Sequence, residues 1–120
     1  MDSEFLPYQY SVLLEKHGFD KPCFGFYWYA VPALKWELVI RQISSAHLGT
    51  VLAPLWQQAF EFIRTELGYH VEIIPIFGHN KQIRHYRVRI NDSTMFELGI
   101  IKTYEVAREA ALDFILSKLD

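Results

Sequence analysis

Residues 69–101 read YHVEIIPIFGHNKQIRHYRVRINDSTMFELGII, three apolar-rich runs separated by two short polar segments. Their β-branched and aromatic residues predict three strands. The runs cover 69–77, 82–90 and 95–101. The segments 78–81 and 91–94 consist of turn-forming residues, so consecutive strands should pair as antiparallel hairpins. Pro75 lacks a backbone donor, which favours an edge or a bulge for the first strand.

Two amphipathic helices flank these strands, because apolar residues recur at the helical period over 54–67 and 104–119. Thr50 or a near neighbour is the predicted cap of the first helix, and Thr103 that of the last. The order over 50–120 is therefore α-β-β-β-α. We expect both helices to pack on one face of the antiparallel sheet.

The front section, 1–49, is less regular. A short helix is predicted between Pro7, which suits a first turn, and Gly18, which suits the left-handed position after a helix end. The aromatic run CFGFYWYAV (23–31) favours a strand. Partial alternation over 34–43 favours a second strand, with a helix as the alternative.

Length and composition indicate one globular domain over 1–120, in which an α-β-β front precedes the α-β-β-β-α unit. The chain has 120 residues, is 51% hydrophobic and 22% charged, and carries a formal net charge of −2. The fold class predicted is α+β, with an antiparallel sheet of three to five strands and helices on one face. A domain of this size can bury a sufficient core without disulfides or a structural metal.

The chain shows no sign of export or of membrane insertion. Cys23 is the one cysteine, so an intrachain disulfide is excluded and a reducing compartment is favoured. The N-terminus lacks a basic region followed by an apolar one, and no run approaches 18 apolar residues. We therefore expect a cytoplasmic protein with no membrane partner.

Basic residues concentrate in the segment KQIRHYRVR (81–89). Alternation along a strand would place Arg87 and Arg89 on the face away from the core. The candidates for contact with phosphates, nucleic acid or an acidic partner are Lys81, Arg84, Arg87 and Arg89. The competing interpretation is a solvated face whose arginines pair with Glu72 or Glu97 of neighbouring strands. The slightly negative net charge favours this second interpretation.

Aromatic residues make up 16% of the chain, and many of them lie within 24–36. They can fill the core, or they can form the exposed anchor of an interface, where Trp and Tyr concentrate. The candidate interface aromatics are Tyr27, Trp28, Tyr29 and Trp36.

No catalytic motif is present, so the sequence predicts a non-enzymatic protein. The patterns of phosphate-binding loops, dinucleotide-binding loops and serine hydrolases are absent. The five histidines follow no ligand spacing, and we expect neither a metal nor a cofactor. Cys23, within an aromatic strand, is predicted to be a small core residue rather than a nucleophile.

Three segments together resemble a family of small uncharacterised proteins encoded in Bacteroides-type genomes and their phages or mobile elements. They are EFLPYQYSVLLEKHGFDKPCFGFY (4–27), APLWQQAFEFIRTELGY (53–69) and TYEVAREAALDFIL (103–116). The resemblance covers nearly the whole chain in order and spacing. It implies an intracellular, mobile-element setting, but no reaction, substrate or functional residue.

The order α-β-β-β-α is also that of the double-stranded RNA-binding domain, whose last helix start resembles the stretch from Gly99 to Ala111. Thr103 matches the helix cap, and the alanines match packing positions. Tyr104 and Glu105 stand where that domain has two phosphate-binding lysines, and a carboxylate repels the RNA backbone. This resemblance therefore implies a fold and no activity.

Together these patterns predict an interaction protein that acts through protein–protein contacts. We expect it to self-associate or to bind another protein through its aromatic N-terminal half. The alternative is binding of RNA or DNA through the basic strand.

Overall fold

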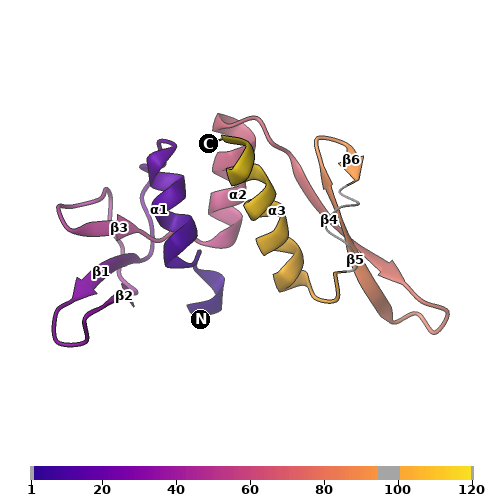
Figure 1. Cartoon of the computed structure of the whole chain (residues 1–120), viewed down its shortest axis with the longest axis horizontal. Coiled ribbons are helices and arrows are strands. Elements are labelled where there is room, and N and C mark those ends of the chain that lie inside the picture. Colours follow the sequence, from indigo (N-terminus) through magenta and orange to yellow (C-terminus); the bar gives the residue numbers. More distant parts are fainter. Residues whose placement is uncertain (1, 95–100, 120) are drawn as a thin grey trace. The chain divides into compact units, whose positions relative to one another are not determined.

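The computed structural model describes residues 2–94 and 101–119, and it confirms the α+β class (Figure 1). The chain forms two compact units, Met1–Phe62 and Ile63–Asp120. Helix α2 (Trp56–Glu66) crosses the boundary between them. The strands of the described residues belong to two three-stranded antiparallel sheets, one in each unit. Each unit is described separately below.

The first unit contains a short helical turn, a helix and the sheet of order β2-β1-β3. Its elements are η1 (Asp2–Glu4), α1 (Tyr8–Lys16), β1 (Phe26–Ala30), β2 (Lys35–Val39) and β3 (Thr50–Leu52). Both β2 and β3 pair antiparallel with the central β1. The segment 34–43 therefore contributes a strand, as favoured from its alternation, and not a helix.

Two local expectations in this unit had different outcomes. Gly18 has a φ of +99° directly after α1, so the predicted left-handed helix end is confirmed. The prediction of Thr50 as a helix cap is wrong, because Thr50 lies in β3 and α2 begins six residues later at Trp56. The Thr50 hydroxyl instead donates to the carbonyl oxygen of His47 at 2.7 Å and accepts from its N–H at 2.8 Å.

The core of the first unit joins its N-terminal segment to β1. Phe5, Leu6 and Leu14 are almost completely buried. The Tyr27 hydroxyl donates a 2.7 Å hydrogen bond to the carbonyl oxygen of Leu6, and the Ser11 hydroxyl donates to the same oxygen at 3.2 Å. A buried hydroxyl needs a hydrogen-bond partner, and the Leu6 carbonyl oxygen provides it, so Tyr27 can lie in the core.

The second unit contains the sheet of order β4-β5-β6 and helix α3 (Tyr104–Leu119). Its strands are β4 (Val71–Phe77), β5 (Ile83–Ile90) and β6 (Ser93–Thr94). Pro75 lies in β4, which is an edge of this sheet, as its missing N–H predicted. Of the third predicted strand, only Ile101 lies among the described residues, where it accepts a 2.8 Å hydrogen bond from the Tyr86 N–H.

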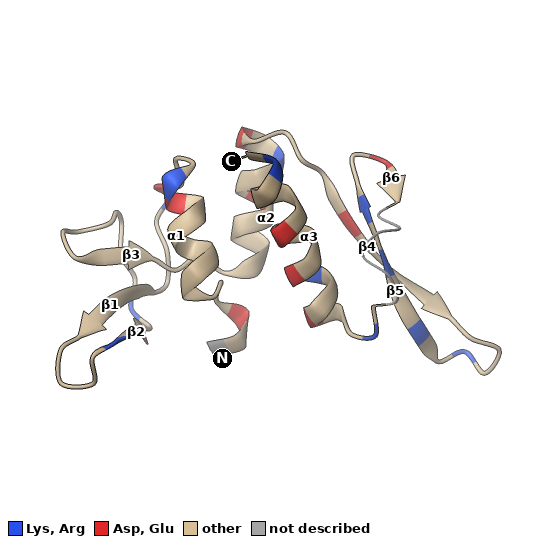
Figure 2. Cartoon of the chain, in the orientation of Figure 1, with Lys and Arg blue, Asp and Glu red and all other residues tan. Residues whose placement is uncertain are grey.

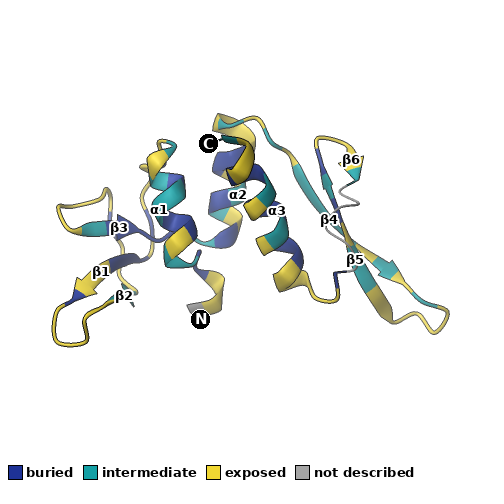
Figure 3. Ribbon diagram, in the orientation of Figure 1, coloured by how far each residue is buried: buried dark blue, intermediate teal, exposed yellow. Residues whose placement is uncertain are grey.

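Helix α3 covers one face of this sheet through contacts with β4 and β5. The Val106 N–H donates to the Thr103 hydroxyl at 3.1 Å, which confirms the predicted cap. Figure 3 shows buried residues along one side of α3, and its fully buried side chains are Ala107, Ala111, Leu112 and Ile115. In β5, which α3 contacts, Val88 and Ile90 are also buried. The opposite sheet face is the one that carries the basic residues.

Candidate interaction surfaces

The aromatic residues of the first unit occupy the hairpin formed by β1 and β2. Tyr29 lies directly opposite Trp36, with ring centroids 5.7 Å apart, and Tyr27 lies opposite Leu38. Tyr8 of α1 stacks on Trp36 at 4.8 Å and meets Tyr27 edge-on at 5.6 Å. Helix α1 therefore covers the sheet face that carries Tyr27, Tyr29 and Trp36.

Burial differs between neighbouring residues of β1, in which Phe26, Tyr27 and Ala30 are buried. Tyr27 is 9% exposed, whereas Trp28 is 48% and Tyr29 43% exposed. In the turn, Val31 and Leu34 are 69% and 71% exposed. We call Trp28, Tyr29, Val31 and Leu34 the hairpin patch. Of the four aromatics singled out from the sequence, Tyr27 belongs to the core, Trp36 is half-buried, and Trp28 and Tyr29 are available at the surface.

Trp28 stands on the sheet face opposite to Tyr29, between polar neighbours. The antiparallel register places it opposite Glu37 of β2 and Thr50 of β3. Directly opposed side chains lie within contact distance on one face of a sheet. The exposed end of the hairpin thus presents an aromatic ring on each of its two faces.

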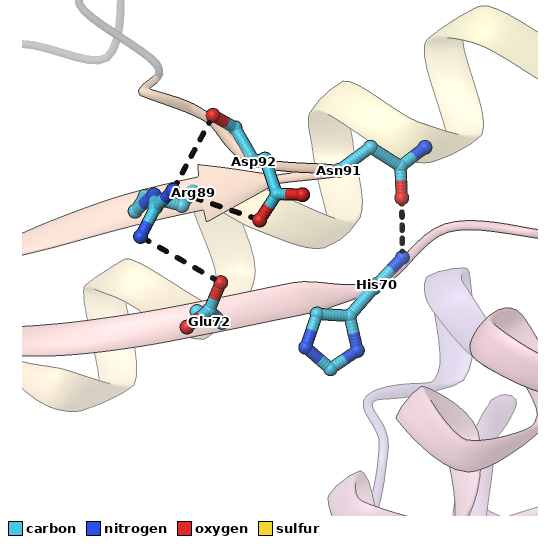
Figure 4. A network of polar contacts seen from close by, with 5 residues as sticks. All are labelled: His70, Glu72, Arg89, Asn91 and Asp92. Carbon is cyan, nitrogen blue, oxygen red and sulfur yellow. Dashed lines mark hydrogen bonds and ion pairs between the residues drawn. The ribbon is translucent and has the colours of Figure 1, made fainter.

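The basic face of the second unit is only partly neutralised. Arg89 lies opposite Glu72, with their charged groups 3.9 Å apart, and it also lies 3.6 Å from the Asp92 carboxylate (Figure 4). The predicted pairing with Glu72 is therefore confirmed for Arg89. The other glutamate of that prediction, Glu97, lies outside the described residues.

Arg87 lies opposite an apolar residue, Ile74, and His85 lies opposite Ile76. Within residues 2–94 and 101–119, neither Arg84 nor Arg87 forms an ion pair, and both are exposed. Lys81 is also exposed, at a φ of +65° in the turn that precedes β5. Figure 2 shows these basic positions along β5 and its hairpin turn.

A register shift in β5 brings Arg84 onto the basic face. Ile76 pairs with His85, but the next residue, Phe77, pairs with Ile83, so Arg84 is the extra residue of a bulge. Directly opposed residues share a face, which puts Ile83 on the α3 side with Phe77. Arg84 then follows on the opposite side, together with His85. Simple alternation from the sequence would have placed Arg84 on the other face.

The one cysteine of the chain, Cys23, is a buried free thiol. Burial raises the pKa of the Cys23 thiol to about 12, so it is a neutral thiol at pH 7 rather than a nucleophile. Its sulfur contacts the carbonyl oxygen of Lys21 at 3.3 Å. Among the described residues, no three His, Cys, Asp or Glu side chains are grouped to hold a metal ion.

In the described part of the chain, no helix is both long enough and apolar enough to span a bilayer. No protein-family model, curated protein or solved structure matches the chain. The assignment of the two interaction surfaces is therefore supported only by their geometry.

Two features of these surfaces were not predicted from the sequence. The exposed turn residues Val31 and Leu34 were not singled out, although Pro32 between two strand-like runs marks a turn that an apolar residue could occupy. Strand β3 was also missed, because its three residues are too few for a period to be recognised.

Proposed function

We propose that this chain is a non-enzymatic interaction protein that binds protein through the hairpin patch. The observation that carries the proposal is the exposure of Trp28 and Tyr29 in a strand whose other residues are buried. Its origin in a phage or mobile element is part of the proposal and rests on the family resemblance alone.

Exposed aromatic residues on a β-hairpin are suited to recognition of a partner protein. Tyr and Trp lose little conformational entropy on binding and are enriched among the residues that dominate interface energies. Tyr29 is held by its ring contact with Trp36, which Tyr8 supports in turn. Binding through this patch would thus bury apolar area at a small ordering cost.

Replacing Trp28 and Tyr29 together by alanine should abolish specific protein binding while leaving the fold intact. Truncation of central aromatic anchors typically weakens binding by about 2 kcal/mol or more each. The measurement is affinity capture from the native host with tagged wild type and variant, quantified by mass spectrometry. Leu48→Ala, at a fully exposed apolar residue outside the hairpin patch, is the matched control. Equal recovery of every retained protein by wild type and double variant would contradict the proposal.

A second candidate, binding of RNA or DNA by the face of β5, is favoured by the bulge. It aligns Arg84 with Arg87, and both lack an ion pair among the described residues. Arginine grips phosphate oxygens bidentately, and the open side of a sheet can accommodate a nucleic-acid backbone. Against it, Arg89 is already engaged by Glu72 and Asp92.

For this candidate, reversing the charges at Arg87 and Arg89 to glutamate should remove salt-sensitive binding. Each phosphate contact on duplex DNA lowers log K by about 0.9 per tenfold rise in salt. Fluorescence anisotropy with labelled RNA and DNA at about 50 mM salt measures this slope. Lys16→Glu combined with Lys21→Glu changes the net charge equally and should retain binding. Absence of binding by the wild type, or equal binding by the Arg87→Glu, Arg89→Glu variant, would exclude the basic face.

A further inference from the structure

We propose that the protein partner is a second copy of this chain, which adds to the free edge of β2 in an antiparallel pairing centred on Trp36. This inference rests on the proposed function and names its partner. It joins two three-stranded sheets into one continuous sheet, with β2 of each copy at the centre.

The edge of β2 is open among the described residues. In the order β2-β1-β3, strand β2 has β1 as its one neighbour. Unpaired strand edges present a row of backbone donors and acceptors and are templates for pairing with another chain. The hairpin patch adjoins this edge, because Leu34 immediately precedes Lys35.

The charges of β2 select one register. Pairing centred on Trp36 places Lys35 opposite Glu37 of the second copy, and Glu37 opposite its Lys35. Trp36 then lies opposite Trp36 of the second copy, so apolar residues also meet. Centring the pair on Lys35 or on Glu37 would instead oppose two like charges, which destabilises a sheet.

The charged residues that this pairing uses are not engaged elsewhere in the described part of the chain. Neither Lys35 nor Glu37 takes part in an ion pair there. Lys35 is exposed and Glu37 half-buried, on the sheet face opposite to Trp36. The interface is isologous, since each strand contributes the same residues, and a two-fold pairing of this kind closes at a dimer.

Charge reversal tests the register directly. We expect the wild type to dimerise at about 10 to 100 µM in sedimentation velocity, a range that reports micromolar affinity. Lys35→Glu and Glu37→Lys should each weaken self-association about tenfold or more, because two attractive pairs become repulsive. An equimolar mixture of the two variants should recover the dimer, since every opposed pair is again of opposite charge. Lys21→Glu is the control for net charge and should dimerise normally.

Engineered cysteines provide an independent measurement. Mixing Lys35→Cys with Glu37→Cys under mild oxidation should produce a crosslinked heterodimer, while neither variant alone should crosslink. Directly opposed residues in an antiparallel pair have Cα atoms about 4.5–5.5 Å apart, within the range that a disulfide needs. The buried thiol of Cys23, with its pKa raised to about 12, does not compete at pH 7.

Each outcome decides between the two proposals. A wild type that stays monomeric across this concentration range overturns the second-copy inference. Capture that depends on Trp28 and Tyr29 would then still support binding to a different protein. A dimer that both charge variants form as well as the wild type, without the predicted crosslink, overturns the pairing centred on Trp36.

Discussion

Replacing Ile115 with alanine is expected to lower the free energy of unfolding by about 3 kcal/mol, and replacing Leu14 should have an effect of similar size. Both side chains are completely buried, one in each compact unit. The loss combines the transfer free energy of the removed methyl and methylene groups with the cost of the cavity left behind. Leu48→Ala, at a fully exposed position, should change stability by less than about 0.5 kcal/mol.

The same two variants test whether residues 1–120 form a single domain. Because α2 is continuous across the boundary at Phe62, we expect unfolding of either unit to disrupt a helix that the other unit needs. Urea denaturation followed by tryptophan fluorescence and by circular dichroism should therefore give one coincident transition, shifted by both variants. Two separate transitions, each shifted by one variant alone, would show that the chain consists of two domains.

Gly25→Ala is expected to cost about 2 kcal/mol, because the added methyl group has no room. A Cβ atom at this position would lie 2.8 Å from Cε1 of Phe5 and 3.1 Å from the carbonyl oxygen of Val39. The Phe5 ring is buried, and the Val39 oxygen belongs to the backbone of β2. Neither can move without disturbing the packing between the N-terminal segment and the hairpin. Chemical denaturation measures the loss.

A matched glycine and a double-mutant cycle separate overpacking from other effects of the substitution. At Gly78, a Cβ atom would meet nothing nearer than Asn80 Oδ1 at 3.6 Å, so Gly78→Ala should be nearly neutral. Phe5→Leu removes part of the obstructing ring, and the double variant Phe5→Leu, Gly25→Ala should be less destabilised than the sum of the singles by about 1 kcal/mol. Strict additivity would show that the contact with Phe5 is not the cause.

Local chemistry made several features predictable from the sequence. Pro75 lacks a donor and is found in an edge strand, Gly18 takes the left-handed conformation after α1, and Thr103 caps α3. The alternation of β5 also predicted that Val88 faces the core and Arg87 does not. Each of these outcomes depends on a residue's own backbone preference or on the two-residue period of a strand. Both can be recognised from residues that are close together in the sequence.

The interaction surfaces depended on tertiary structure. Tyr27 and Tyr29 share one face of β1, but Tyr27 is buried with its hydroxyl bonded to Leu6, whereas Tyr29 is exposed. A period of two assigns a side chain to a face, but it does not say how far along the strand a covering helix extends.

The same distinction applies to the basic face. Arg89 and Arg87 have the same position in the pattern of β5, yet only Arg89 lies opposite a glutamate. Arg84 joined this face because one residue of β5 bulges where β4 has none. By itself the sequence determined the fold class, the C-terminal end of α1, the N-terminal cap of α3 and the alternation of β5. Strand pairing and register decided which aromatic and basic side chains reach the surface, because they depend on residues far apart in the chain.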